Sequence, residues 1–211
     1  AMAPLAILSG VTTVREATVH PTLGAFLQRM LFDEIVPGSG LAVDHAREFA
    51  RTVVDRFRNP WLEHRWDIIA TNQTPKLRVR VVPSVLKFLA LCHRVPSCLA
   101  LACAASLRYA RCIEQVSASE GRGWWRGATY RIQDVDVSRV NDHWWAVDPQ
   151  HAPGAVPAHT LHRLVTRVFA DADLWGTSFA AVPELVTAVA AALCRLEEAG
   201  VEGAIAAVDG A

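Results

Sequence analysis

The sequence lacks an excess of charge of either sign. Its 211 residues include 21 lysines and arginines and 21 aspartates and glutamates, so the formal net charge is zero. Proteins that bind nucleic acid usually obtain much of their affinity from a basic surface. The balanced charge therefore argues against a nucleic-acid partner.

An unbroken apolar run of membrane-spanning length is also missing. The most apolar stretch, residues 84–107, is broken by Lys87, by His93 and Arg94, and by Pro96. It never reaches the ~20 continuous apolar residues that a bilayer requires. The first residues lack the basic, apolar and small-residue blocks of a signal peptide. We therefore expect a cytoplasmic protein with no membrane partner.

The cysteines form no pattern of a metal or redox site. There are five of them, an odd number, without a C-x-x-C pair, and four lie in one apolar region. We predict reduced thiols that pack as small hydrophobic side chains. Cys92 stands beside His93, but the spacings fit no familiar zinc site, so no metal is predicted.

A glycine-rich turn such as G-x-G-x-x-G between a strand and a helix is absent too. That turn is the fingerprint of a dinucleotide-binding domain. Any such domain is therefore expected outside this chain. The opening residues Ala1–Pro4 already lie inside an apolar segment, which indicates a fragment of a longer protein.

Helical periodicity dominates what is present. Apolar residues recur at intervals of three and four, the spacing of one helix face, and predict helices over 21–37, 46–57, 61–72, 83–91, 96–112, 158–170 and 183–199. Gly200 would stop the last helix. The predicted fold is mainly α with little strand.

Two segments depart from this period. Residues 76–82 alternate between basic and apolar, which predicts an extended segment with Lys76, Arg78 and Arg80 on one side. Residues 117–157 show no sustained period and are interpreted as a connecting region. Two tryptophan pairs fall there, at 124–125 and 144–145; sugar stacking is one interpretation, but such wide rings more often cap a hydrophobic core.

Four segments together resemble a known family. They are VREATVHPTLGAFLQRMLFDEIVP (14–37), FARTVVDRFRNPWLEH (49–64), NQTPKLRVRVVPSVL (72–86) and FADADLWG (169–176). They resemble the C-terminal domain of the polyol-specific long-chain dehydrogenases, the mannitol dehydrogenase family, and within it the tagaturonate reductases (altronate oxidoreductases). The resemblance runs from Ala1 to about Val208, and residues 117–157 match loosely.

The resemblance implies a fold, a cofactor and a reaction. Residues 1–211 would form a multi-helical domain of the 6-phosphogluconate dehydrogenase C-terminal type. An N-terminal Rossmann domain outside the chain would bind NAD. The implied reaction is reversible hydride transfer between NAD and a hexonate such as altronate, giving the keto acid tagaturonate, without a metal.

The family's catalytic lysine belongs to a K-x-x-x-x-N-x-x-H motif, and the resemblance places this motif immediately before Ala1. No catalytic acid or base is therefore assigned within the chain. In the longer protein that lysine would exchange a proton with the reacting alcohol. We expect the chain alone to be inactive.

Substrate-binding residues are implied within the chain itself. Lys76 falls where the family has a lysine that contacts substrate, and a cation there suits a carboxylate or hydroxyl groups; alternatively it is solvated on an extended edge. Asn72 could offer hydroxyl groups a donor and an acceptor, or simply end a helix.

His64 could pair with a carboxylate if its helix pointed into the cleft between the domains. Arg80 would share a side with Lys76 and bind a carboxylate in bidentate fashion. Ion pairs are the commoner outcome for such arginines, here with Asp55, Glu63 or Asp67.

The substrate remains open between several members of the family. Mannitol dehydrogenases have an arginine where this chain has Ile68, which argues against simple mannitol chemistry. The alternatives are a fructuronate reductase domain or a mannitol or hexitol dehydrogenase domain. From another class comes a non-catalytic helical interaction module.

Overall fold

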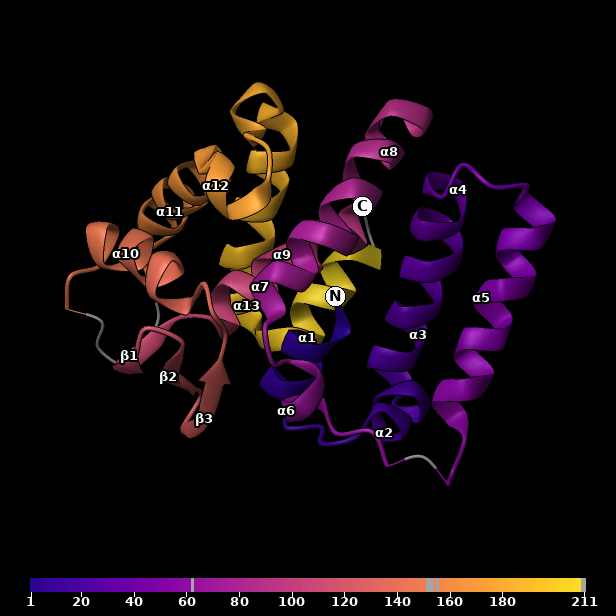
Figure 1. Cartoon of the computed structure of the whole chain (residues 1–211), viewed down its shortest axis with the longest axis horizontal. Coiled ribbons are helices and arrows are strands. Elements are labelled where there is room, and N and C mark those ends of the chain that lie inside the picture. Colours follow the sequence, from indigo (N-terminus) through magenta and orange to yellow (C-terminus); the bar gives the residue numbers. More distant parts are fainter. Residues whose placement is uncertain (62, 151–153, 155, 210–211) are drawn as a thin grey trace.

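The computed structural model describes residues 1–61, 63–150, 154 and 156–209 (Figure 1). Within these ranges helices predominate, and the strands form one three-stranded antiparallel sheet. The prediction of a mainly α fold with little strand is confirmed. None of the described helices is long and apolar enough to cross a membrane.

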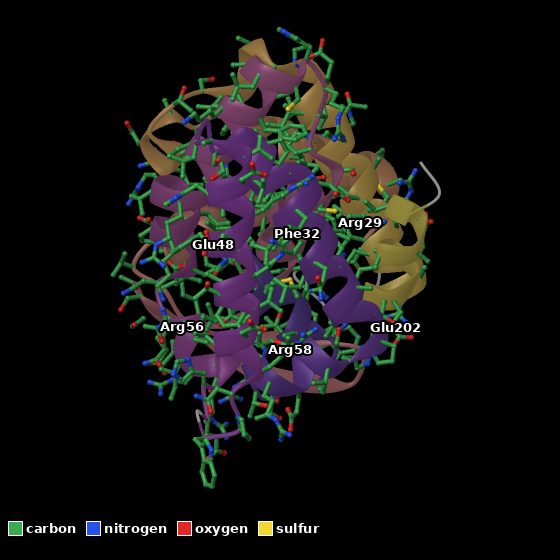
Figure 2. All side chains as sticks on the ribbon, turned by 90° about the vertical axis from the view of Figure 1, so that its right-hand side faces the viewer. Arg29, Phe32, Glu48, Arg56, Arg58 and Glu202 are labelled. Atoms are coloured by element: carbon green, nitrogen blue, oxygen red, sulfur yellow. The ribbon has the colours of Figure 1, made fainter. Side chains whose placement is uncertain are left out.

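The first third of the chain includes a helical rod and an outer helix that runs antiparallel beside it (Figure 1). Its elements are α1 (Met2–Leu8), α2 (Val14–Val19), α3 (Pro21–Arg29), the π-helical turn η1 (Met30–Ile35), α4 (Val36–Gly38) and α5 (Val43–Arg58). The helix predicted over 21–37 is confirmed as the rod α3–η1–α4, and that over 46–57 as α5. Phe32 packs against a small cluster of Val36, Ala46 and Ala50, which joins α5 to the rod (Figure 2).

The middle of the chain corrects two predictions. Its elements are α6 (Trp66–Ile69), α7 (Gln73–Lys76), the π-helical turn η2 (Leu77–Val81), α8 (Val82–Cys92) and α9 (Ser97–Tyr109). The helix predicted over 61–72 is reduced to the single turn α6. The backbone before it pairs with the loop after α1 instead, because Val14 N donates to His64 O (2.9 Å) and Trp66 N donates to Thr12 O (2.9 Å).

The extended segment predicted over 76–82 is wrong, because α7, η2 and α8 follow one another as helix. An alternation over seven residues is also compatible with about two turns of helix. Leu77 and Val81, four positions apart, are buried, whereas Val79 between them is 65% exposed. Burial thus follows the helical period of three to four and not the period of two of a strand.

Residues 117–157 are not a loose connection. They contribute to a sheet of β1 (Cys112–Ser117), β2 (Glu120–Trp125) and β3 (Ala128–Gln133), in that order, followed by α10 (Val137–Val147). Two glycines in β2 interrupt the alternation of side chains that would predict a strand. A Cβ on Gly121 would collide with Cys112, and one on Gly123 would collide with the Tyr130 ring. Alternating side chains were therefore not available as a signal.

The C-terminal elements reach the buried helix α9 through the long helix α13. They are α11 (Ala158–Ala170), α12 (Ala172–Trp175), the 3₁₀ turn η3 (Phe179–Ala181) and α13 (Pro183–Asp209). Helices α1 and α13 pack on α9, and α11 packs on α13. Gly200 breaks α13 with φ of 74°, as predicted, but helix resumes after it to Asp209.

The burial of two tryptophans confirms the interpretation that they cap the hydrophobic core. Trp144 is fully buried and donates from Nε1 to Leu107 O (3.1 Å), and Trp125 is 7% exposed. All five cysteines are free thiols, and Cys98 and Cys112 are buried. Burial raises the pKa of each of these two thiols to about 12, so neither is a ready nucleophile.

Candidate functional site

Lys76 ends the first turn of the helix that begins after Asn72. Its Nζ donates to Ile69 O (2.8 Å) and Thr71 O (2.7 Å), and its side chain is half-buried. Burial lowers the pKa of Lys76, and the charge of Arg80 lowers it further. Lys76 is therefore held by the main chain and is not solvated on an extended edge.

Arg80 lies four residues after Lys76, about one helical turn away, and so on the same side of the helix. Its side chain is exposed and forms no ion pair within the described part of the chain. Arg78 is directed elsewhere: it pairs with Asp136 (3.4 Å) and donates to the carbonyl of Leu174 (3.2 Å). The structure thus places two of the three cations together.

The ion pairs predicted for these arginines are not found among the described residues. Asp136, not Asp55, Glu63 or Asp67, is the acid beside Arg78, and Asp67 pairs with its near neighbour Arg65 (3.0 Å). The prediction assumed an extended segment, which would have pointed Arg78 and Arg80 the same way.

Asn72 stands in the left-handed conformation (φ 52°) at the start of α7. Its N donates to Gln133 O (2.8 Å), and its Oδ1 accepts from Val135 N (3.1 Å). Its Nδ2 has no hydrogen-bond partner within the described ranges. Asn72 therefore stabilises this turn and keeps both Nδ2 donors available, and its contact with substrate stays a prediction.

His64 lies outside this group. It precedes α6 on an extended segment, so the helix that was expected to carry it is not there. Its exposed side chain lines a small hollow of about 30 Å³ with Val14, Arg56 and Phe57. The described residues show no contact between His64 and Lys76. Its role in binding substrate stays a prediction.

Sequence reasoning missed Asp134, which is 3% exposed. Its Oδ2 accepts from Thr74 N (2.6 Å), in the first turn of α7. Burial raises the pKa of Asp134, while the N–H groups that it accepts lower it. Its partner lies 60 residues away in the sequence, and no local pattern reports such a contact.

Ala1 lies close to the two cations. The pKa of its amino group is lowered to about 6, mainly by burial and also by the charges of Arg80 and Lys76. Figure 1 shows this end of the chain near the middle of the molecule. The charges of Lys76 and Arg80 thus act on the start of the chain.

Two hollows of about 580 Å³ each lie elsewhere. One is bounded by the loop after α1, the start of α6 and the β2–β3 hairpin, and the other lies between α3 and α13. Neither is lined by Lys76, Arg80 or Asn72. The Arg80 side chain is exposed and that of Lys76 is half-buried.

The described residues do not suit a dinucleotide. Their strands pair in antiparallel fashion, β1 with β2 and β2 with β3, and form no βαβ unit that could receive a pyrophosphate. The same residues contain no group of three or more His, Cys, Asp or Glu side chains that could hold a metal ion. We derive no hydride-transfer step from these residues.

Comparison with known proteins agrees with this geometry. The altronate oxidoreductases of Yersinia pestis bv. Antiqua (strain Nepal516) and Cronobacter sakazakii (strain ATCC BAA-894) are each 32% identical to 98% of the chain. A solved structure, the Pseudomonas fluorescens mannitol 2-dehydrogenase ternary complex with NAD and D-mannitol, matches 99% of the chain with a TM-score of 0.76 and 19% identity.

The chain spans about 40% of the length of these proteins: 40% and 39% of the two oxidoreductases and 38% of the solved structure. A family model described as the mannitol dehydrogenase C-terminal domain matches residues 1–197. Because this match takes in nearly all of the 211 residues, the chain belongs to the mannitol dehydrogenase C-terminal domain family.

Proposed function

We propose that residues 1–211 are the substrate-binding domain of an NAD-dependent oxidoreductase that interconverts a hexonate and its keto acid, altronate and tagaturonate. The observation that carries this proposal is the pair Lys76 and Arg80. Two cations share one side of a helix, and neither has an acid in direct contact within the described ranges.

This pair is unfavourable by itself. Like charges four residues apart on a helix destabilise it by about 0.2 to 0.5 kcal/mol. Lys76 also stands in the first turn after Asn72, near the positive end of the helix dipole. A carboxylate ligand would relieve both effects. A sugar acid supplies that charge, and a neutral hexitol does not.

The amino group of Lys76 has room for one more acceptor. An ammonium carries three N–H donors, and Ile69 O and Thr71 O take two of them. The third is available to a carboxylate or a hydroxyl. Arg80, one turn away, would add a second charged donor to the same ligand.

NAD and the catalytic lysine would belong to the part of the protein outside this chain. The likeness to the altronate oxidoreductases, of which the chain spans about 40%, supports an additional domain. In the proposed enzyme, NAD accepts or supplies the hydride. The family's lysine motif would end just before Ala1.

Fructuronate reductase is the nearest alternative, because the same two cations suit any hexonate. A mannitol or hexitol dehydrogenase fits less well: Ile68 is 67% exposed where mannitol dehydrogenases have an arginine. A non-catalytic helical module is the alternative from another class. A reading frame before Ala1 that encodes a glycine-rich βαβ unit and the lysine motif would exclude it.

Substitution of Lys76 tests the proposal in an enzyme that joins the N-terminal part of Yersinia pestis altronate oxidoreductase to this chain. Lys76→Met keeps much of the apolar stem and removes the charge. Loss of a charge-assisted hydrogen bond of about 1.5 to 3 kcal/mol would lower kcat/KM for tagaturonate about 10- to 150-fold. Asn72→Ala should give a smaller drop.

Lys87→Met is the matched control, because Lys87 is on the same helix and also donates to a main-chain carbonyl, that of Ser39. Steady-state kinetics should show the loss with tagaturonate only in Lys76→Met, and the KM for NADH should not change. A kcat/KM within about twofold of the parent would mean that Lys76 does not bind substrate.

A further inference from the structure

The turn before Lys76 is attached to the segment that follows β3. Asn72 donates from its N to Gln133 O (2.8 Å) and accepts from Val135 N at its side-chain Oδ1 (3.1 Å). The left-handed conformation of Asn72 lets both bonds form at a single residue. The start of the helix that carries Lys76 is thus fixed by residues from another part of the chain.

Asp134 is the acid at this junction, where the turn before Lys76 meets the segment that follows β3. Its buried carboxylate accepts from Thr74 N (2.6 Å) through Oδ2 and from Asp136 N (3.0 Å) through Oδ1. The first N–H groups of a helix have no partner within it. Asn72, at the N-cap position, makes no side-chain cap there. Asp134 therefore caps this helix from 60 residues away.

Lys76 depends on this junction through geometry and through charge. The carbonyls that hold its Nζ, those of Ile69 and Thr71, directly precede the attached turn, so the attachment sets where Nζ lies. Asp134 is also the acid whose negative charge raises the pKa of Lys76, in opposition to burial and to Arg80.

We propose that Asp134 is a positioning residue for Lys76. Its carboxylate fixes the turn whose carbonyls hold the amino group, and its charge favours the ammonium form that a carboxylate ligand requires. That Lys76 meets substrate rests on the proposed function. The dependence of Lys76 on Asp134 is a property of the folded chain, and it can be measured without any enzyme activity.

The chain itself permits this measurement, because Lys76 and Lys87 are its two lysines. Protein labelled with ¹³Cε-lysine gives one signal from each, and pH titration gives the two pKa values. In Asp134→Asn, a near-isosteric change that still offers an acceptor to Thr74 N, we expect the Lys76 pKa to move to lower pH. The Lys87 pKa should stay unchanged.

Asp173→Asn is the matched control, because Asp173 is an exposed acid that pairs with Arg139 (2.9 Å) and not with this turn. It should leave both lysine signals at their parent values. A folded Asp134→Asn protein in which the Lys76 pKa equals that of the parent, or moves only as much as in Asp173→Asn, would overturn the proposal.

A titration of the unmutated chain provides a second test of the proposal. It is sufficient by itself if Asp134→Asn does not fold. The Lys76 Cε signal should show an additional step at the pH where the Asp134 carboxyl carbon titrates, and the Lys87 signal should not. Absence of that step would overturn the proposal. If Lys76→Met leaves kcat/KM for tagaturonate unchanged, that outcome counts against the proposed function. It does not affect the measured dependence of Lys76 on Asp134.

Discussion

The isolated 211-residue chain is expected to cause no oxidation of NADH in the presence of tagaturonate and no saturable binding of NADH. Its described strands form an antiparallel meander, which offers no dinucleotide site. Of the two cations assigned to substrate, Arg80 is exposed and Lys76 is half-buried. Substrate contacts alone do not transfer a hydride, so the expected loss of activity is complete.

Absorbance at the nicotinamide band and NADH fluorescence measure this directly. Yersinia pestis altronate oxidoreductase under identical conditions is the positive control. Turnover by the purified chain that scales with its concentration would show that these residues hold both the cofactor and the catalytic acid. The proposal that NAD and the catalytic lysine belong to another domain would then be wrong.

Glu197→Gln is expected to lower the free energy of unfolding by about 3 to 5 kcal/mol, because it leaves a buried arginine without its acid. Arg108 and Glu197 have side chains that are 1% and 5% exposed, with Nε and Oε1 2.6 Å apart. Arg108 also lies over the Trp125 ring at 4.7 Å and donates to Trp124 O (3.0 Å). The pair thus ties α9 to both α13 and the sheet.

Urea denaturation followed by circular dichroism measures this effect. Asp67→Asn is the control, since it breaks the exposed pair with Arg65 and should change stability little. Equal stability of Glu197→Gln and the parent would mean that the pair is dispensable and that packing alone holds α13 on α9.

Elements with a long apolar period could be predicted from the sequence. The rod α3–η1–α4 and helix α5 each bury one face, and proline or glycine marks their ends. The pattern fails where it is short or hidden. Seven residues could not distinguish a strand from a helical turn at Lys76, and glycines concealed β2.

The relative placement of the proposed site residues was predicted only in part, and for physical reasons. Arg80 shares the side of Lys76 as expected, but through the helical spacing of four and not through a strand. His64 was assigned to a helix that starts two residues later. Asp134 could not be found, because its contact with Thr74 exists only in the folded chain.

The central claim is that Lys76 and Arg80 bind the carboxylate of a sugar acid. The most direct test is the ratio of kcat/KM for tagaturonate to that for the neutral ketose D-tagatose, in the enzyme that joins this chain to the N-terminal part of Yersinia pestis altronate oxidoreductase. One charge-assisted contact predicts a ratio of at least about 10, which should fall towards unity in Lys76→Met. A ratio near unity in the parent, or one that Lys76→Met leaves unchanged, would contradict the claim.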